Sequence, residues 1–526
     1  MPSVGDVIFI SLLGLLVFTG LSVRLLGDAG IGWHIRTGQL MLATHAVPRV
    51  DPFSSSRGGQ PWFAWEWMYD ALVGWLEKVA GLNGVVLFTG LIIGAVFSWA
   101  FRWLVRRGTN VPLALILVLL AVSASMIHFL ARPHVVSWLF TMGWFWVLES
   151  FEKPCDFGAQ RHWLVWLLPL TMLLWVNVHG GFLVGFVLLG IYWVCAVWEW
   201  LSLSLTVTEG RIEDVVRKIR AGQRAWSLGL AGFLSVAATL VNPYGLRLHV
   251  HIYRYLSNRF LMDHIDEFQS PNFHYVAQKC FAGLLMLTLV ALAVKRRGAG
   301  ARELLVVLFA VYTGLYAARN IPVSSLLLIL VIGPWLSEGM EKLASGLADR
   351  RTHRWPGFGS TRFLSKMKTI ELSLRGHAWP VAAMVLTWLI AANGGGLGGT
   401  QLMEANFDSK RFPVEAVNYV EKQAVEGPVL SPDNWGGYLI YRLYPRIKTV
   451  VDDRHDFYGE EFLKSYLTMI HVEPGWQDFL REHPSQWIVM PKNSALASIL
   501  GVSAGWRTVY SDEVAVVFER DAAKHE

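Results

Sequence analysis

Charged side chains are scarce in this sequence. Only 16% of its 526 residues are Asp, Glu, Lys or Arg, while 53% are hydrophobic and 25 are tryptophan. Soluble domains carry about a quarter charged residues, so this composition excludes an ordinary soluble protein and indicates a polytopic membrane protein. The net charge of +6 is small for this length, and we expect no nucleic-acid partner.

Cysteine is nearly absent as well. Cys155, Cys195 and Cys280 lie in or beside hydrophobic runs and form no CxxC motif. This spacing implies neither a disulfide framework nor a zinc site. The first apolar run lacks a strongly basic leader and a small-residue cleavage site, so we expect it to be a retained span and not a removed signal peptide.

Hydrophobic runs long enough to cross a bilayer core of about 30 Å recur along most of the chain. About eleven spans are expected, over residues 6–26, 82–104, 111–130, 134–151, 162–177, 181–203, 225–245, 278–294, 303–318, 322–338 and 379–396. Residues 1–396 are therefore predicted to form a transmembrane domain.

The distribution of basic residues predicts the orientation of these spans. With a cytoplasmic N-terminus, every strongly basic loop falls on the cytoplasmic side, as the positive-inside rule requires. These loops contain Arg102, Arg106 and Arg107; Lys153 and Arg161; Arg211, Arg217, Lys218, Arg220 and Arg224; Lys295, Arg296, Arg297 and Arg302; and Lys342, Arg350, Arg351, Arg354, Arg362, Lys366, Lys368 and Arg375. Eleven crossings then leave the C-terminal end outside the cytoplasm.

The tail over residues 397–526 has a different pattern. The stretch NGGGLGGT at its start predicts a flexible linker. Beyond it, FPVEAVNYVEKQ, WGGYLIYRLYP and GEEFLKSYLTMI predict helices, whereas GPVLS, KTVVDD, QWIVMP, WRTVYS and EVAVVFE predict strands. A segment of about 130 residues suffices for one small core, so we expect a compact extracytoplasmic α/β domain.

The first outer loop, residues 27–81, is long and not apolar enough to span. IGWHIRTGQLML has the spacing of an interfacial amphipathic helix, with Trp33, Ile35, Leu40 and Leu42 available to the bilayer boundary. The Pro/Gly/Ser-rich stretch HAVPRVDPFSSSRGGQPW predicts a loop. WFAWEWMYDALVGWL predicts a second aromatic-rich helix, in which Glu66 and Asp70 lie one turn apart on one face.

Polar residues recur in the other expected outer turns. They are Arg132 and His134 in LARPH, Asn177 and His179 in VNVHGG, and Arg319 and Asn320 in AARNIP, and similar groups occur in NPYG and MDHIDEFQSPNFH. A charged group at membrane depth costs roughly 2.5–3.5 kcal/mol, so such groups line a cavity or have a partner. Several on one face predict a polar cavity that opens outward.

This set of residue types predicts a chemistry for the cavity. Arginines can hold a phosphate bidentately and stabilise the charge that develops on a leaving group. A carboxylate opposite them can accept a proton from an attacking hydroxyl or amine. The expected substrate is a lipid phosphate or diphosphate whose head group lies at this depth and whose tail stays in the bilayer.

With these motifs in view, the sequence resembles the integral membrane glycosyltransferases of the GT-C fold superfamily, which include protein O-mannosyltransferases and aminoarabinose transferases. The likeness rests on GDAGIGWHIRTG after the first span, VPRVDPFS, WFAWEWMYD and the turns NPYG and RNIP. It is strongest over residues 1–200. The segments WGGYLIYRLYP and VVDDRHDFY look like the tails of bacterial members of unassigned substrate.

The resemblance implies a polyprenyl-phosphate-linked sugar as donor and an acid of the first outer loop as catalytic base or metal ligand, which is Asp28 here. Many relatives have two adjacent acids, whereas this chain has Gly27-Asp28-Ala29. A single acid favours metal-independent proton abstraction, although the need for a divalent cation stays open. The expected donor-phosphate ligands are Arg36, Arg132 and Arg319, and the expected sugar or acceptor pocket contains His34, Glu66, His134, Asn177, His179 and Asn320.

Several of these residues also have a structural interpretation. Asp28 could cap the helix that follows it, and Arg132 and Arg319 could snorkel at span ends. His34 and Arg36 could meet lipid phosphates non-specifically, and Glu66 could lie in an aromatic belt. The sequence DDRH, with Asp452, Asp453 and His455, predicts a solvated turn with an internal salt bridge, or a lid over the cavity, and not a catalytic or metal site.

The predicted function is transfer of a sugar to a glycan, lipid or protein acceptor on the outer side of a bacterial cytoplasmic membrane. Two other functions remain open. A lipid or lipid-linked-sugar flippase would also have many spans, although such transporters usually show internal repeats, and none is evident here. A non-catalytic envelope assembly factor would use the tail to dock a partner.

Overall fold

The computed structural model describes residues 1–152, 162–206, 212–295, 298–348, 361–424 and 426–521. Cys155 lies outside the described residues. So do the loop cations Lys153, Arg161, Arg211, Arg296, Arg297, Arg350, Arg351 and Arg354.

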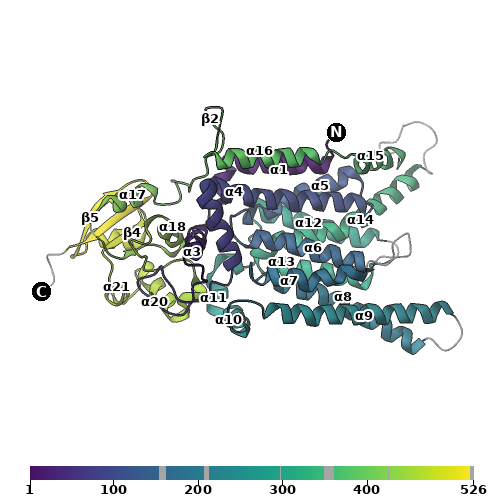
Figure 1. Cartoon of the computed structure of the whole chain (residues 1–526), viewed down its shortest axis with the longest axis horizontal. Coiled ribbons are helices and arrows are strands. Elements are labelled where there is room, and N and C mark those ends of the chain that lie inside the picture. Colours follow the sequence, from purple (N-terminus) through teal and green to yellow (C-terminus); the bar gives the residue numbers. More distant parts are fainter. Residues whose placement is uncertain (153–161, 207–211, 296–297, 349–360, 425, 522–526) are drawn as a thin grey trace.

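The helices described between Val4 and Ala392 lie side by side as a bundle (Figure 1). Its helices are α1 (Val4–Phe18), α2 (Leu21–Leu25), α4 (Trp67–Arg106), α5 (Val111–Ser125), α6 (His134–Glu152), α7 (Leu167–Trp175), α8 (Phe182–Thr206), α9 (Ile212–Thr239), α12 (Val276–Val294), α13 (Ala301–Tyr316), α14 (Ile321–Ala348) and α16 (Ala378–Ala392). Each of the eleven expected spans falls on one of these helices or, for the first span, on the pair α1 and α2.

Short elements connect the bundle helices. They are the 3-10 turns η1 (Met126–His128), η2 (His162–Trp166), η3 (Asp266–Phe268) and η4 (Ala318–Asn320), and the helices α3 (Gly30–Thr44), α10 (Leu246–Ser257), α11 (Arg259–His264) and α15 (Thr361–Ser373). In Figure 1, α3, α10 and α11 lie at the end of the bundle that adjoins the C-terminal domain, and α15 lies at the opposite end. We call these the domain end and the far end.

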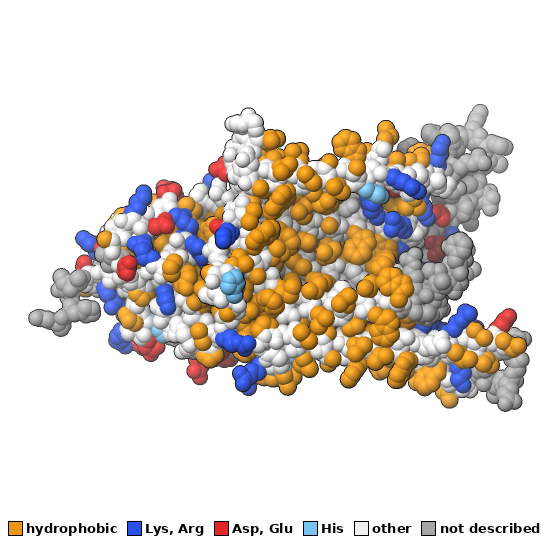
Figure 2. Space-filling view, in the orientation of Figure 1, with side chains coloured by type: hydrophobic (Ala, Val, Ile, Leu, Met, Phe, Trp, Pro, Cys, Tyr) orange, Lys and Arg blue, Asp and Glu red, His pale blue; other side chains and the backbone are white. Residues whose placement is uncertain are grey.

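The bundle has the surface of a membrane protein. Among the described residues, five segments are long and apolar enough to cross a bilayer: Trp67–Arg106, Val111–His128, Phe182–Thr206, Val276–Val294 and Ala318–Leu343. Shorter apolar helices, such as Val4–Phe18 and Ala378–Ala392, accompany them. Hydrophobic side chains cover the middle of the bundle, and Lys and Arg gather toward its ends (Figure 2). Helices suit this surface because they satisfy every backbone hydrogen bond internally. The structure is that of a polytopic helical membrane protein.

The two helices of the first outer loop differ from their expected form. The aromatic-rich helix is the first part of α4, which kinks at Ala80 and Gly81, where Gly81 has a φ of 60°, and continues as the expected second span. The helix α3 is not interfacial as predicted. Trp33 and Ile35 are buried, because α3 packs between α4 and a helix of the C-terminal domain. Of the four residues expected at the bilayer boundary, only Leu42 is exposed.

The C-terminal domain is the expected small α/β unit. Its sheet has the order β3-β4-β6-β5, in which β3 and β4 are parallel and the other neighbours antiparallel. The strands are β3 (Val429–Leu430), β4 (Trp487–Pro491), β5 (Trp506–Ser511) and β6 (Ala515–Arg520), and the helices are α17 (Val414–Lys422), α18 (Asp433–Leu443), α19 (His455–Tyr458), α20 (Glu460–Ile470), α21 (Gln477–Glu482) and α22 (Ala495–Leu500). The expected strand KTVVDD is reduced to bridges from Thr449 to Val429 and Ser54.

The glycine-rich stretch before this domain is not a flexible linker. Residues Gly396–Leu397 and Thr400–Gln401 pair as the antiparallel strands β1 and β2 of a hairpin. Gly398 and Gly399 make its turn with positive φ, a conformation that only glycine adopts without strain. The glycines therefore build a tight turn.

Glycines also bring the two parts of the molecule into backbone contact. A Cβ atom on Gly32 of α3 would fall on the carbonyl oxygen of Gly437, and one on Gly437 of α18 would fall on the carbonyl oxygen of Ala29. Because neither helix has a side chain at this crossing, α18 lies directly on the first turns of α3. This contact holds the C-terminal domain over the segment that contains Asp28.

Candidate active site

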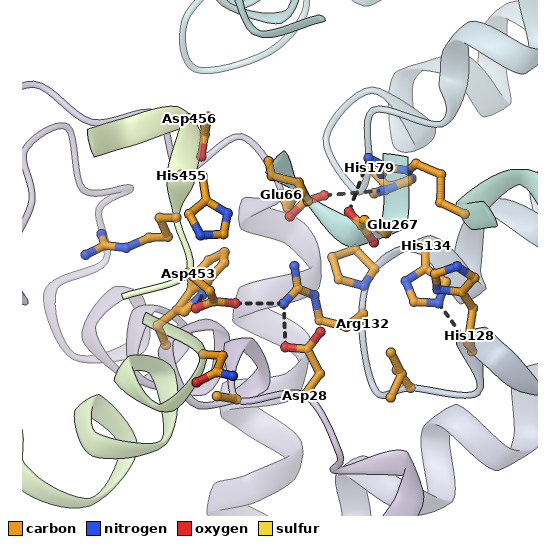
Figure 3. Close-up of a pocket in the computed structure, with 18 of the residues that line it drawn as sticks. Asp28, Glu66, His128, Arg132, His134, His179, Glu267, Asp453, His455 and Asp456 are labelled. Carbon is orange, nitrogen blue, oxygen red and sulfur yellow. Dashed lines mark hydrogen bonds and ion pairs between the residues drawn. The ribbon is translucent and has the colours of Figure 1, made fainter. Parts of the chain in front are cut away.

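A cavity of about 550 Å³ lies between the domain end of the bundle and the C-terminal domain (Figure 3). Its walls come from the α2–α3 turn, the first outer loop, the α5–α6 and α7–α8 turns, η3 and η4, and the C-terminal segment from Asp453 to Asp456. These are the turns in which the sequence concentrates polar residues. The polar cavity expected on this face is therefore present.

Arg132 is the cation that joins the two sides of the cavity. Its Nη1 donates to Asp28 Oδ1 at 2.8 Å and to Asp453 Oδ2 at 3.1 Å, so one nitrogen bridges an acid of the membrane domain and an acid of the C-terminal domain. A Cβ on Gly30 would collide with both Arg132 and Asp453. The glycine after Asp28-Ala29 thus leaves the room that this bridge occupies.

Asp28 also contacts the start of the following helix, although the N-cap residue of α3 is Ala29. Its Oδ1 accepts from the backbone N–H of Gly30 at 2.8 Å, the first residue of α3. Asp28 makes this contact and the ion pair with Arg132 at the same time, because its Oδ1 accepts both hydrogen bonds. None of the contacts within the described chain reaches Asp28 Oδ2, and the side chain is about one-third exposed, at 32%.

Arg319 lies on the other side of the cavity. Its Nη1 is 3.3 Å from Glu267 Oε1, and its guanidinium lies 4.4 Å from the centre of the Phe268 ring. Burial acts to raise the pKa of Glu267, but Arg319, followed by His128 and Arg132, lowers it to about 2. Arg319 is therefore held in place by an ionised acid.

Three of the predicted pocket residues meet around one carboxyl group. The Glu66 oxygens lie 3.8 Å from His34 Nε2 and 3.8 Å from His179 Nε2. Burial raises the pKa of Glu66 to about 8. Asp70, one turn further along α4, is 2.5 Å from His34 Nδ1. Figure 3 shows Glu66 and His179 facing each other across the cavity wall.

His134 and Asn320 occupy neighbouring positions. His134 lines the cavity, and its Nε2 donates to the backbone carbonyl oxygen of His128 at 2.9 Å. Asn320 lines an adjoining cavity and donates to the carbonyl oxygen of Thr313 at 3.1 Å. His134 Nε2 and Asn320 Nδ2 thus each donate to a backbone carbonyl oxygen.

Three of the predicted residues do not line either cavity: His34, which is fully buried beside Glu66, Arg36 and Asn177. Arg36 donates from Nε to the carbonyl oxygen of Tyr441 at 2.8 Å and lies over the Tyr441 ring, so it ties α3 to α18. Asn177 is buried; it accepts from Trp67 Nε1 and donates to the carbonyl oxygens of Leu173 and Val241. Neither residue belongs to the lining of the cavity.

The segment DDRH is not a solvated turn, because two of its residues are buried and two half-buried. Asp452 and Arg454 form the expected internal salt bridge, 2.7 Å from Oδ2 to Nη2, but both side chains are buried, and Arg454 also reaches Asp51 at 2.8 Å. Asp453 and His455 line the cavity, as the lid interpretation requires. Burial raises the pKa of Asp453 to about 6; Arg132 opposes this shift and Asp28 adds to it.

Two arginines that were not predicted as site residues, Arg24 and Arg411, also line the cavity. Arg24, in α2, donates from Nη2 to the carbonyl oxygen of Met126 at 3.2 Å, and Arg411 lies in the segment before α17. Neither one forms a salt bridge within the described part of the chain. Arg24 could have been predicted from the sequence, because it lies four residues before Asp28. Arg411 could not, because only the tertiary structure brings it to the cavity.

A second cavity of about 370 Å³ adjoins the first. The two share the side chains of Trp65, His128, His134, His179, Tyr255, Glu267 and Arg319. Beyond them the walls become apolar, with Trp138, Leu183, Val184, Ile252, Leu256, Met262 and Val323. A polar cavity thus leads into an apolar one among α6, α8, α10 and α14. Among the described residues no group of three His, Cys, Asp or Glu side chains is arranged to hold a metal ion.

No protein-family model matches this sequence, and no curated protein matches it. Solved structures do match. The apo oligosaccharyltransferase of Archaeoglobus fulgidus is 10% identical, and the alignment covers 99% of this chain and 74% of that one with a TM-score of 0.56.

Two ligand-bound structures match as well. One is the A. fulgidus oligosaccharyltransferase AglB with an inhibitory peptide and a dolichol-phosphate, at 11% identity, 93% and 68% coverage and a TM-score of 0.55. The other is ArnT from Cupriavidus metallidurans bound to undecaprenyl phosphate, at 15% identity, 99% and 97% coverage and a TM-score of 0.50. Both proteins are GT-C glycosyltransferases. At these identities the likeness establishes architecture: the chain has the GT-C fold.

Proposed function

We propose that this protein is a membrane glycosyltransferase that moves a sugar from a polyprenyl-phosphate-linked donor to an acceptor on the outer side of the cytoplasmic membrane. The observation that carries the proposal is the bridge from Asp28 through Arg132 to Asp453, in a polar cavity that continues into an apolar one. A lipid phosphate has these same two parts, an anionic head and an apolar tail.

Arg132 has donors to spare for a phosphate. Its bonds to Asp28 and Asp453 both use Nη1, so they leave Nε and Nη2, which are the pair that binds an oxyanion bidentately. Arg319, Arg24 and Arg411 line the same cavity and add positive charge. In this proposal the phosphate lies between Arg132 and Arg319, and the donor tail lies in the second cavity.

The ligands of the structural neighbours support this assignment of head and tail. AglB was solved with a dolichol-phosphate and ArnT with undecaprenyl phosphate, and both molecules join a phosphate to an isoprenoid chain. Burial of such a chain contributes about 0.8 kcal/mol for each methylene removed from water. The apolar walls from Trp138 to Val323 suit it.

Asp28 is the proposed general base. Its Oδ1 is fixed by Arg132 and by the Gly30 N–H, which leaves Oδ2 to accept a proton. The acceptor oxygen or nitrogen forms a bond to the anomeric carbon of the sugar and gives its proton to Asp28, and the bond from that carbon to the phosphate oxygen breaks. The arginines stabilise the negative charge left on the phosphate.

The test is a deletion strain complemented with variants, in which lipid carriers are extracted from the two membrane faces and separated by thin-layer chromatography. We expect the sugar-loaded carrier to accumulate on the outer face in the deletion strain and with Asp28→Asn, whose transfer rate falls by about 10²–10⁴ because a general base is lost. Asp263→Asn is the matched control, because Asp263 is exposed and outside the cavity lining.

Three outcomes would contradict the proposal. Loaded carrier held on the cytoplasmic face would make the protein a flippase. An unchanged carrier pool in the deletion strain would leave it an assembly factor. Full complementation by Asp28→Asn would remove the proposed base.

A further inference from the structure

Glu66 is a buried carboxyl group in the wall of a cavity that the proposed function assigns to a phosphate. Only 8% of its surface is exposed, and it precedes the first turn of α4. The titratable and charged groups that face it come from every element around it: His34 of α3, Asp70 of α4, Arg132 of the α5–α6 turn, His179 of the α7–α8 turn, Glu267 and Arg319 of η3 and η4, and Asp456 of α19, which is itself paired with His251 of α10.

The hydrogen bonds of His179 fix where its ring proton lies. The backbone N–H of Gly181 donates to His179 Nδ1 at 2.9 Å, and Ser137 Oγ lies 2.8 Å from the same nitrogen. A backbone N–H can only donate, so Nδ1 is an acceptor and carries no proton. The ring is therefore neutral with its proton on Nε2, the atom that lies 3.8 Å from Glu66 Oε1.

His34 faces the other Glu66 oxygen. Its Nδ1 lies 2.5 Å from Asp70 Oδ1, and both side chains are fully buried. Burial lowers the pKa of His34, so its ring is neutral, and its second ring nitrogen is Nε2. This nitrogen is buried without a hydrogen-bond partner in the described chain, and it lies 3.8 Å from Glu66 Oε2.

The two rings together favour one protonation state of Glu66. Both rings are neutral, so neither brings to Glu66 a positive charge that would stabilise its carboxylate. Burial acts in the same direction and raises the pKa of Glu66 to about 8. At 3.8 Å neither ring nitrogen is within hydrogen-bond distance of the acid. The acid proton is thus available to a ligand.

We propose that Glu66 is a neutral acid that donates a hydrogen bond to the phosphate of the lipid carrier, with His34, Asp70 and His179 as positioning residues that keep the acid protonated. Ionised Glu66 would repel the phosphate, so ionisation of this one group would weaken carrier binding. The inference rests on the proposed function, because it concerns the same phosphate.

The sign of the pH dependence follows from the raised pKa. Below about pH 8 Glu66 is protonated and donates, and above it Glu66 is a carboxylate that opposes the anion. If only the protonated form binds, affinity falls about tenfold between pH 7 and pH 9, in proportion to the protonated fraction. Between these pH values the phosphate is already ionised, since its second pKa is about 6, and Asp453, with a pKa of about 6, is ionised as well.

The experiment measures binding of undecaprenyl phosphate to the full-length protein in lipid nanodiscs at pH 7 and pH 9. We expect the wild type to bind about tenfold more weakly at pH 9. Glu66→Gln should bind with similar affinity at both values, because a side-chain amide of the same shape donates a hydrogen bond and does not titrate. Asp263→Asn is the matched control, because Asp263 is an exposed acid outside the cavity lining; this variant should keep the wild-type pH dependence.

The outcomes separate this inference from the proposed function. Wild-type binding that is equal at pH 7 and pH 9, or an unchanged tenfold loss in Glu66→Gln, would overturn the inference alone. Absence of wild-type binding at both pH values would overturn the proposed function and the inference with it. The pH dependence of binding is measured on the wild type alone. The inference therefore stays testable even if Glu66→Gln misfolds.

Discussion

The two ends of the helical bundle both carry partly buried ion pairs, but they use arginine differently. At the far end Arg224 donates through Nη1 to Glu152 and through Nη2 to Glu199, and Arg302 lies 2.8 Å from the same Glu152. The Glu152 side chain is only 5% exposed. At the domain end a single nitrogen of Arg132 serves two acids, and the Asp28 side chain is 32% exposed.

This difference separates an ion pair that holds helices together from one that is set up for a ligand. At the far end both Nη atoms of Arg224 are used on acids that come from α6 and α8, so the cluster joins these helices to α9. At the domain end two Arg132 donors remain beside a cavity of about 550 Å³. An ion pair with an acid therefore does not by itself distinguish a structural arginine from a functional one. The distinction is whether guanidinium N–H groups remain free to bind a ligand.

The largest expected effect comes from removing the domain-end arginine. Arg132→Ala should weaken binding of undecaprenyl phosphate about a hundredfold, because loss of charge-assisted hydrogen bonds costs about 3 kcal/mol. Arg302→Ala at the far end should change the affinity less than about twofold, within the scatter of surface substitutions. Equal losses in the two variants, measured by nanodisc binding, would abolish the distinction between the ends.

A smaller effect is expected from the far end, and on stability only. Glu152→Gln leaves Arg224 and Arg302 without their shared carboxylate, which should lower the free energy of unfolding by about 2 kcal/mol. The affinity for undecaprenyl phosphate should stay at the wild-type value. Thermal unfolding in detergent and nanodisc binding measure the two quantities, and a loss of affinity in this variant would contradict a purely structural role.

The smallest effect is expected where the C-terminal domain meets α3. Gly437→Ala puts a methyl group against the carbonyl oxygen of Ala29, and overpacking of this kind costs about 1 kcal/mol. Hydrogen exchange should quicken in α3 and α18. Gly501→Ala is the control, because its Cβ would make only ordinary contacts. Unchanged exchange in Gly437→Ala would show that this crossing does not hold the domain.

Sequence patterns predict the membrane half of the site because its signals are local. Long apolar runs fix the helices, and the turns that connect them carry the polar residues Asp28, Arg132, His179 and Arg319. Turns on one side of a bundle meet at one end, so these residues were expected together. The strands and helices of the tail follow from local periodicity in the same way.

Contacts between distant segments could not be predicted. Asp453 meets Arg132 across 321 positions of the chain, and Arg411 enters the cavity from the segment before α17. Arg36 and Asn177 have the residue types of a binding site but bond to backbone of packed helices instead. The interfacial position expected for α3 was wrong for the same reason, because the helix that covers it, α18, begins at Asp433, far along the chain.

The most direct test of this account is a structure of the protein with undecaprenyl phosphate in a lipid nanodisc. The account predicts the phosphate between Arg132 and Arg319, within hydrogen-bond distance of Arg132 Nη2, and the isoprenoid chain against Trp138 and Val323. A phosphate bound at the far end beside Arg302, or a lipid outside both cavities, would contradict it.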